Sequence, residues 1–124
     1  MTSETLTDLQ ISVMKALWAV GEGTVGDIHE ALNSTGKELA PTTVATLLQR
    51  LAKQGWVQHR KSGRVFLYRA RVDAKEAAKG VLQRVLRTFF DGRASILTAQ
   101  LLESEQLSPA ELLEMRKLLE RKRR

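Results

Sequence analysis

Apolar residues recur every three or four positions in the first third of the chain, which is the spacing of one helix face. The first such stretch begins at Thr7 and Gln10, which have the spacing of a capping box, and glycines end it. A second, shorter stretch follows Thr24, a residue type that often caps helices. The pattern therefore predicts one helix over 7–20 and another over about 24–33.

A third helical pattern lies between Pro41, which suits a first helical turn, and Gly55, which suits a C-terminal cap. At helical spacing its aliphatic residues share a sector of roughly 100°, which predicts a buried stripe. The opposite face carries hydroxyls, one amide and two bases but no acid. This face comprises Thr42, Thr43, Thr46, Gln49, Arg50 and Lys53. Such a surface suits insertion into the major groove of DNA, because hydroxyls and amides bond base edges while bases bond phosphates.

Two strand-like runs follow, over 56–61 and 64–70, and Ser62 and Gly63 between them favour a tight turn. They predict a β-hairpin. Three bases lie close to its tip, namely Arg60, Lys61 and Arg64. Three helices followed by a basic-tipped hairpin predict a winged helix-turn-helix, in which the wing touches the DNA backbone or minor groove.

Several ring side chains of the first seventy residues are predicted to have structural rather than catalytic roles. Trp18 is predicted to pack in or beside the core, as most tryptophans are largely buried. Phe66 and Tyr68 are predicted to serve wing packing and the core rather than to stack on single-stranded bases. His29 is predicted to be a surface histidine on the outward side of the second helix, because no partner is near it in sequence.

From Asp73 the apolar spacing is helical again, and Asp73 and Glu76 fit a capping pair. Another helical stretch covers 94–104, and Ser108 followed by Pro109 marks the start of a last helix. These three helices hold more leucine than roughly fifty residues bury alone, which predicts a dimer interface. The alternative is that they fold back on the preceding residues of the same chain.

These elements predict a mainly α fold with a small β-hairpin wing. Residues 1–72 are expected to form a winged helix-turn-helix DNA-binding domain, and residues 73–124 a helical dimerisation domain.

The distribution of charge supports a nucleic-acid partner. The net charge is +6, and residues 39–72 contain seven bases and no acid, while residues 1–38 have an excess of acids. Lys and Arg attract a polyanion because each neutralised phosphate releases condensed counterions. A basic face that is merely solvated is the plain alternative.

Composition also limits the classes of function. The 124 residues contain no cysteine and two distant histidines, His29 and His59, so we expect no metal site, no cofactor and no enzyme activity. No apolar run approaches membrane-spanning length and the first residues lack a secretory pattern, so a cytoplasmic protein is expected. An RNA-associated or protein-interaction adaptor that uses the basic 39–72 surface is the alternative function. The narrow major groove of double-stranded RNA, which does not admit a helix, disfavours it.

Four segments carry a resemblance that covers nearly the whole chain: LTDLQISVMKALW, TTVATLLQRLAKQGWV, HRKSGRVFLYRA and LSPAELLEMRKLLE. With these segments the sequence resembles the BlaI/MecI/CopY family of penicillinase-repressor-type transcriptional regulators. The resemblance implies a homodimeric repressor that binds a palindromic operator through its winged helix and dimerises through its C-terminal helices. Such regulators commonly control β-lactamase and penicillin-binding-protein genes, or copper-transport genes.

The sequence also departs from this family at positions that bear on mechanism. Copper-responsive members have a C-terminal cysteine motif, which this chain lacks. Members released by a sensor-linked protease are cut within the dimerisation domain at an Asn–Phe bond, and Gln100 and Leu101 occupy that position here. Ala45 stands where those relatives have an arginine in the recognition helix, so the resemblance does not imply the same operator.

Overall fold

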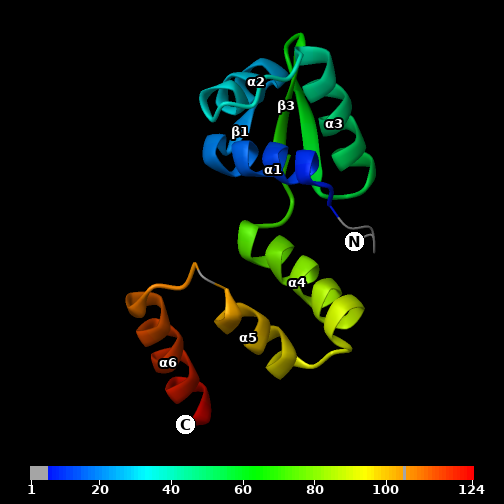
Figure 1. The fold of residues 1–124 in the computed structure, drawn as a ribbon. Helices are drawn as coiled ribbons and strands as arrows, with labels where there is room; N and C mark the ends of the chain where they lie inside the picture. The colour runs from blue at the N-terminus through cyan, green and yellow to red at the C-terminus, as the bar shows by residue number, and fades with distance from the viewer. Residues whose placement is uncertain (1–5, 105) are drawn as a thin grey trace. The chain divides into compact units, whose positions relative to one another are not determined.

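A computed structural model describes residues 6–104 and 106–124 of the chain (Figure 1). Over these residues the chain forms six helices and a three-stranded antiparallel sheet. It divides into two compact units, Met1–Leu82 and Gln83–Arg124. The division falls inside a helix, whereas the boundary expected from the sequence lies at 72/73; the assignment of DNA binding and dimerisation to the two parts stays a prediction.

The first two helices begin at the predicted caps. Helix α1 (Asp8–Val20) starts with a complete capping box, in which the Thr7 hydroxyl accepts from the Gln10 backbone N–H and the Gln10 side chain accepts from the Thr7 N–H. Helix α2 (Val25–Ser34) has the same arrangement, with Thr24 as its cap. The predicted boundaries are therefore confirmed to within about one residue.

Helix α3 (Pro41–Lys53) completes the helix-turn-helix. Pro41 occupies the first turn, and Gly55 follows the C-terminal cap with φ of 89°, in the left-handed region that glycine adopts without strain. The winged-helix class predicted from the sequence is confirmed.

The sheet has the strand order β1-β3-β2, with β1 at Glu22–Gly23, β2 at Val57–Ser62 and β3 at Val65–Ala70. Strands β2 and β3 form the predicted wing hairpin, and their last pair is Ser62 opposite Val65. Strand β1 was not predicted, because two residues are too short for a periodic pattern and Gly21 and Gly23 indicated only the end of the first helix.

Gly23 of β1 lies where no larger residue fits. A Cβ atom there would meet Val20 Cγ1 at 2.9 Å and Asp27 Cβ at 3.0 Å. The missing side chain therefore lets β1 pass between the end of α1 and the start of α2 and pair with β3.

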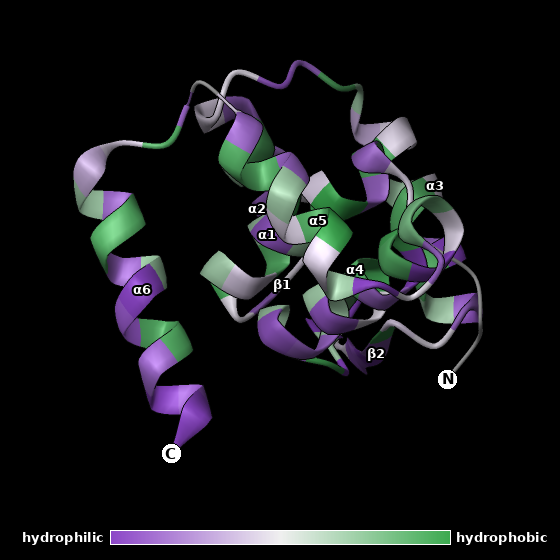
Figure 2. Ribbon diagram, turned by 60° about the horizontal axis from the view of Figure 1, so that its bottom comes forward, coloured by the Kyte–Doolittle hydropathy of each residue, from purple (hydrophilic) through white to green (hydrophobic). Residues whose placement is uncertain are grey.

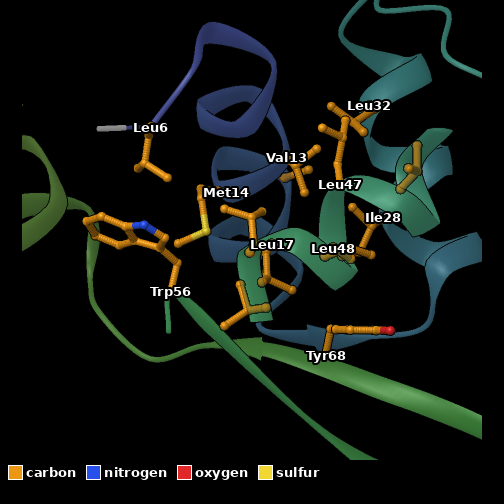
Figure 3. Packing of buried hydrophobic residues seen from close by; sticks show 14 of the residues in the cluster. Leu6, Val13, Met14, Leu17, Ile28, Leu32, Leu47, Leu48, Trp56 and Tyr68 are labelled. Carbon is orange, nitrogen blue, oxygen red and sulfur yellow. The ribbon is translucent and has the colours of Figure 1, made fainter. Parts of the chain in front are cut away.

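The core of the first unit lies among α1, α2, α3 and the sheet (Figure 3). Its largest fully buried side chains are Met14, Leu17, Ile28, Leu32, Leu48, Leu51, Val13, Val44 and Val57. Trp18 packs against this core, and its indole N–H donates to the Val72 carbonyl oxygen at 2.9 Å, which confirms its structural role. Ala77 is 4% exposed within the same core. The core therefore extends past Val72 into the first turn of the next helix.

Helices α4 (Ala74–Phe90), α5 (Ala94–Glu103) and α6 (Pro109–Arg123) lie close to their predicted positions. Asp73 accepts from the Glu76 N–H at 2.8 Å, which confirms this predicted pair at the start of α4. Among the described residues from 83 to 124, none is buried. Figure 2 shows hydrophobic residues interspersed with hydrophilic ones along α6. A single copy of this unit thus has no core.

Candidate nucleic-acid interface

Helix α3 has two chemically different faces. Val44, Leu47, Leu48 and Leu51 are buried against the core, which fixes the helix in place. The predicted outward residues are all exposed, namely Thr42, Thr43, Thr46, Gln49, Arg50 and Lys53. The predicted division of the two faces is confirmed, while the contacts of the outward face with DNA stay predictions.

The hydroxyl of Thr46 is already engaged within the helix. Its Oγ1 donates to the Thr42 carbonyl oxygen at 2.9 Å, one turn earlier. Because a hydroxyl has one proton, Thr46 is left with its lone pairs and its methyl group for a partner outside the protein. Gln49 lies one turn nearer the C-terminus, and its amide has no hydrogen-bond partner among the described residues.

The three bases of the wing differ in their surroundings. Arg60 forms an ion pair with Glu22, with Nη2 to Oε1 at 2.8 Å and Nε to Oε2 at 3.0 Å. Lys61 and Arg64 are exposed and have no ion pair with any described residue. Two of the three bases predicted to contact phosphates are therefore without an ion pair, and the third is paired with an acid of the same chain.

The register of the sheet explains this ion pair. Arg69 of β3 lies opposite Glu22 on one side and Gln58 on the other. Arg60 is two residues beyond Gln58, so its side chain is on the same face of the sheet. The hydrogen bond from Arg60 lowers the pKa of the Glu22 carboxyl, and the hydrogen bond to Glu22 raises that of Arg60. Sequence reasoning missed the pair because it missed β1.

The opposite face of the wing carries a row of rings. The His59 ring meets Phe66 edge-on, with centroids 5.0 Å apart, and lies 5.4 Å from the ring of Tyr68. Tyr68 is buried and Phe66 is half-exposed, which agrees with their predicted roles in the core and in wing packing. The three rings therefore fix one another along the hairpin.

A hollow of about 390 Å³ opens where the start of α2, the middle of α3 and β3 meet. Its lining contains no acidic residue and consists of Thr24, Val25, Gly26, Ala45, Gln49, Val65, Phe66 and Tyr68. The hollow joins the outward face of α3 to the wing. Because three elements distant in sequence form it, no local pattern could have predicted it.

His29 has a partner in the loop between α2 and α3. It is half-buried, and its Nε2 lies 2.7 Å from the carbonyl oxygen of Leu39, to which it donates. The sequence did not indicate this contact, because Leu39 is ten residues away along the chain. The loop between α2 and α3 brings the partner back to the helix, so His29 holds this loop in place.

The remaining predicted positions lie away from this surface in the sequence. Gln100 and Leu101 are exposed on α5. Among the residues that the structure describes, no three His, Asp or Glu side chains gather as a metal site would require. In the same residues, no helix has the length and apolar character needed to cross a membrane.

Comparisons with known proteins agree with this architecture. The family model for penicillinase repressor matches residues 6–121. The penicillinase repressor of Bacillus licheniformis is 30% identical over 115 residues, covering 93% of this chain and 89% of that protein. The methicillin resistance regulatory protein MecI of Staphylococcus aureus is 25% identical over 117 residues, covering 94% of each chain.

A solved structure extends the likeness to the fold. The solution structure of monomeric Bacillus licheniformis BlaI with the blaP half-operator has a TM-score of 0.51 and 31% identity, and covers 60% of this chain and 90% of that one. The family comprises transcriptional repressors rather than enzymes. With its helix-turn-helix, its wing and a family match over nearly its whole length, the chain belongs to the penicillinase repressor family of winged-helix transcriptional regulators.

Proposed function

We propose that the protein represses transcription by binding operator DNA, with α3 in the major groove and the wing beside it. The observation that carries this proposal is the outward face of α3, which is rich in hydroxyls, free of acids and held in place by four buried aliphatic residues. A helix fixed in this way presents its side chains in one orientation, as reading a base sequence requires.

The residues of this face divide by chemistry. Thr42, Thr43, Thr46 and Gln49 are uncharged and suit contacts with base edges. Arg50 and Lys53 lie in the last turn of α3 and suit phosphates.

The wing adds charge beside this helix. Lys61 and Arg64 are free to neutralise phosphates, and Arg60 joins them when a phosphate replaces Glu22 as its partner. That exchange leaves Glu22 without its cation, so Arg60 contributes less to binding than its charge suggests.

We propose that the occupant of the exposed apolar surface on α4, α5 and α6 is a second copy of this chain. Phe89 is 75% exposed, Leu119 is 64% exposed, and none of the described residues from 83 to 124 is buried. A second copy has helices of matching length and apolar character to cover them, and a two-fold dimer presents two recognition helices to one palindromic operator. The two half-sites are then about 34 Å apart along the duplex, or a multiple of that distance.

The same proposal includes release of the operator by a sensor-linked protease that cuts between Gln100 and Leu101. Both residues are exposed on α5, which supports access by a protease. We further propose that the protein acts in the cytoplasm and controls resistance genes of the β-lactamase or penicillin-binding-protein type. The names penicillinase repressor and methicillin resistance regulatory protein, which two relatives carry, support the link to resistance. Mass spectrometry of the protein from cells treated with a β-lactam tests this step. Fragments that end at Gln100 and begin at Leu101 are expected, and an intact chain under induced transcription opposes it.

Selection of genomic DNA fragments on the purified full chain tests the repressor function. We expect enrichment of a palindromic sequence that outcompetes random duplex by at least about a thousandfold. Equal retention of all duplexes would contradict operator recognition and would indicate a basic surface that binds DNA without sequence preference. Preferential retention of RNA would favour the adaptor alternative.

A further inference from the structure

The hydroxyl of Tyr68 lacks a partner although the residue is buried. Tyr68 is 5% exposed, and no described residue forms a hydrogen bond with its hydroxyl. Figure 3 shows the hydroxyl oxygen pointing away from the packed side chains of the core. Tyr68 lines the hollow between α2, α3 and the wing. The Tyr68 hydroxyl is not among the polar atoms shut off from solvent in the described residues, so it is open to a group that enters the hollow from outside.

Other donors line the same hollow. The backbone N–H groups of Val25 and Gly26 are in the first turn of α2, and no described group accepts from them. The next N–H, that of Asp27, is used by the Thr24 hydroxyl. Gln49 borders the hollow on its α3 side, but its amide is proposed to contact base edges rather than the phosphate. The hollow thus combines a helix N-terminus, which favours negative charge, with the hydroxyl of a buried tyrosine.

We propose that the hollow holds a phosphodiester group of the DNA backbone and that Tyr68 donates its hydroxyl to a phosphate oxygen. This inference rests on the proposed function, because it requires α3 to lie in the major groove. The DNA strand that borders the major groove then passes between α3 and the wing, where the hollow opens. Tyrosine hydroxyls, backbone N–H groups and helix N-termini are among the usual phosphate ligands.

The apolar part of the lining fits the same occupant. Val65 and Phe66 are each 47% exposed and lie on β3 at the wing side of the hollow. A deoxyribose next to the bound phosphate presents C–H groups to such side chains. The absence of an acid from the lining removes a source of repulsion.

The structure also holds Tyr68 ready for this contact. His59 packs against its ring, and Gly23 is its partner on β1, so the strands on both sides of β3 position it. Little side-chain freedom is therefore lost on binding.

The variant Tyr68→Phe tests the proposal because it removes only the hydroxyl. We expect affinity for operator and for random duplex to fall by the same factor, about tenfold per half-site, as for a hydrogen bond to a charged group. The slope of log K against log salt should not change, since no charge is removed. The thermal unfolding midpoint should be unchanged, because the hydroxyl has no partner in the free protein. The matched control, Lys61→Ala, should lower the slope.

Replacing single phosphates of a half-site by neutral methylphosphonates locates the contact. At one phosphate of the DNA strand that borders the major groove, the methylphosphonate should weaken binding of the wild type more than it weakens binding of Tyr68→Phe. The difference between the two losses should be about tenfold. At the other positions both proteins should lose affinity equally.

The outcomes separate this inference from the proposed function. A wild type that binds no duplex contradicts the proposed function itself. A wild type that binds duplex, with Tyr68→Phe binding equally well and giving the same methylphosphonate profile, overturns only the phosphate contact. Loss of binding to operator alone would also overturn it, because a backbone contact does not depend on sequence.

Discussion

Arg60 and Glu22 join the wing hairpin to β1 through two hydrogen bonds that cross over β3. The residues are 38 positions apart in sequence, yet the strand order places them on one face of the sheet. Both side chains are accessible to water, so the pair adds little to stability. It instead lowers the free positive charge on the surface of the wing.

Removal of the acid should therefore strengthen DNA binding. In Glu22→Gln, Arg60 has no ion pair to break before it contacts a phosphate, so affinity for any duplex should rise. The slope of log K against log salt should steepen by up to about 0.9 per protomer. Salt titrations of operator and random duplex measure both effects. Weaker binding of this variant would mean that the pair serves to position the wing.

The pH range of the pair follows from the sign of the shift. Because the hydrogen bond from Arg60 lowers the pKa of Glu22, the carboxylate stays charged at neutral pH and the pair is lost only as pH falls through this lowered pKa. From pH 8 to pH 5 the difference in DNA affinity between wild type and Glu22→Gln should therefore stay constant. Binding titrations at each pH check this, and a difference that vanishes above pH 5 would contradict it.

The wing bases should contribute unequally to salt dependence. Lys61→Ala and Arg64→Ala should each lower the log-log slope by about 0.9 per site, and by nearly twice that in a symmetric dimer. Arg60→Ala should lower it less, because Glu22 loses its cation when Arg60 turns to a phosphate. Equal slopes for the wild type and all three variants would show that the wing does not touch DNA.

Specificity should reside in the uncharged residues of α3. Thr46→Ala and Gln49→Ala should weaken operator binding by about 1 to 3 kcal/mol and barely change binding to random duplex. Lys53→Ala, the matched control on the same helix, should weaken both alike. Competition assays with the two DNAs measure this, and parallel losses for the Thr46 and Gln49 variants would show that the helix does not read sequence.

Self-association should depend on the apolar residues of the last helices. The full chain should sediment as a dimer at tens of micromolar. Phe89→Glu should shift it toward monomer, because the new charge would be buried in the proposed interface. The Phe89 side chain is 75% exposed in a single copy. Gln83→Glu, at an exposed polar position of the same helix, should not. A wild-type monomer at these concentrations would contradict the proposed dimer.

The core extends the winged-helix unit beyond Val72. A fragment that ends at Val72 lacks Ala77, which is buried with α1 and the sheet in the same core. A fragment that ends at Leu82 keeps it, and should unfold at a higher temperature than the shorter one. Thermal unfolding followed by circular dichroism compares them, and equal midpoints would mean that the start of α4 adds nothing to this core.

Local signals predicted most of the fold, because capping, turns and apolar spacing depend on residues close in sequence. Thr7, Thr24 and Ser108 cap helices as predicted, and the hairpin turns at Gly63. The outward face of α3 followed from helical spacing alone.

Features that depend on distant residues could not be predicted in this way. Strand β1 exists because β3, more than forty residues later, offers it hydrogen bonds. The partners of His29 and Arg60, and the hollow beside Tyr68, likewise arise only when the chain has folded. Periodicity shows which face of an element is buried, but not which element lies opposite.

The lack of any buried residue among those described from 83 to 124 has a consequence for dosage. If these helices gain their core only from a second copy, their folding is a bimolecular event, and the amount of operator-competent protein rises with the square of monomer concentration when monomers prevail. Occupancy of the operator then responds steeply to the cellular level of the repressor. A modest fall in that level, by dilution at cell division or by destruction of a fraction of the copies, would relieve repression more than in proportion.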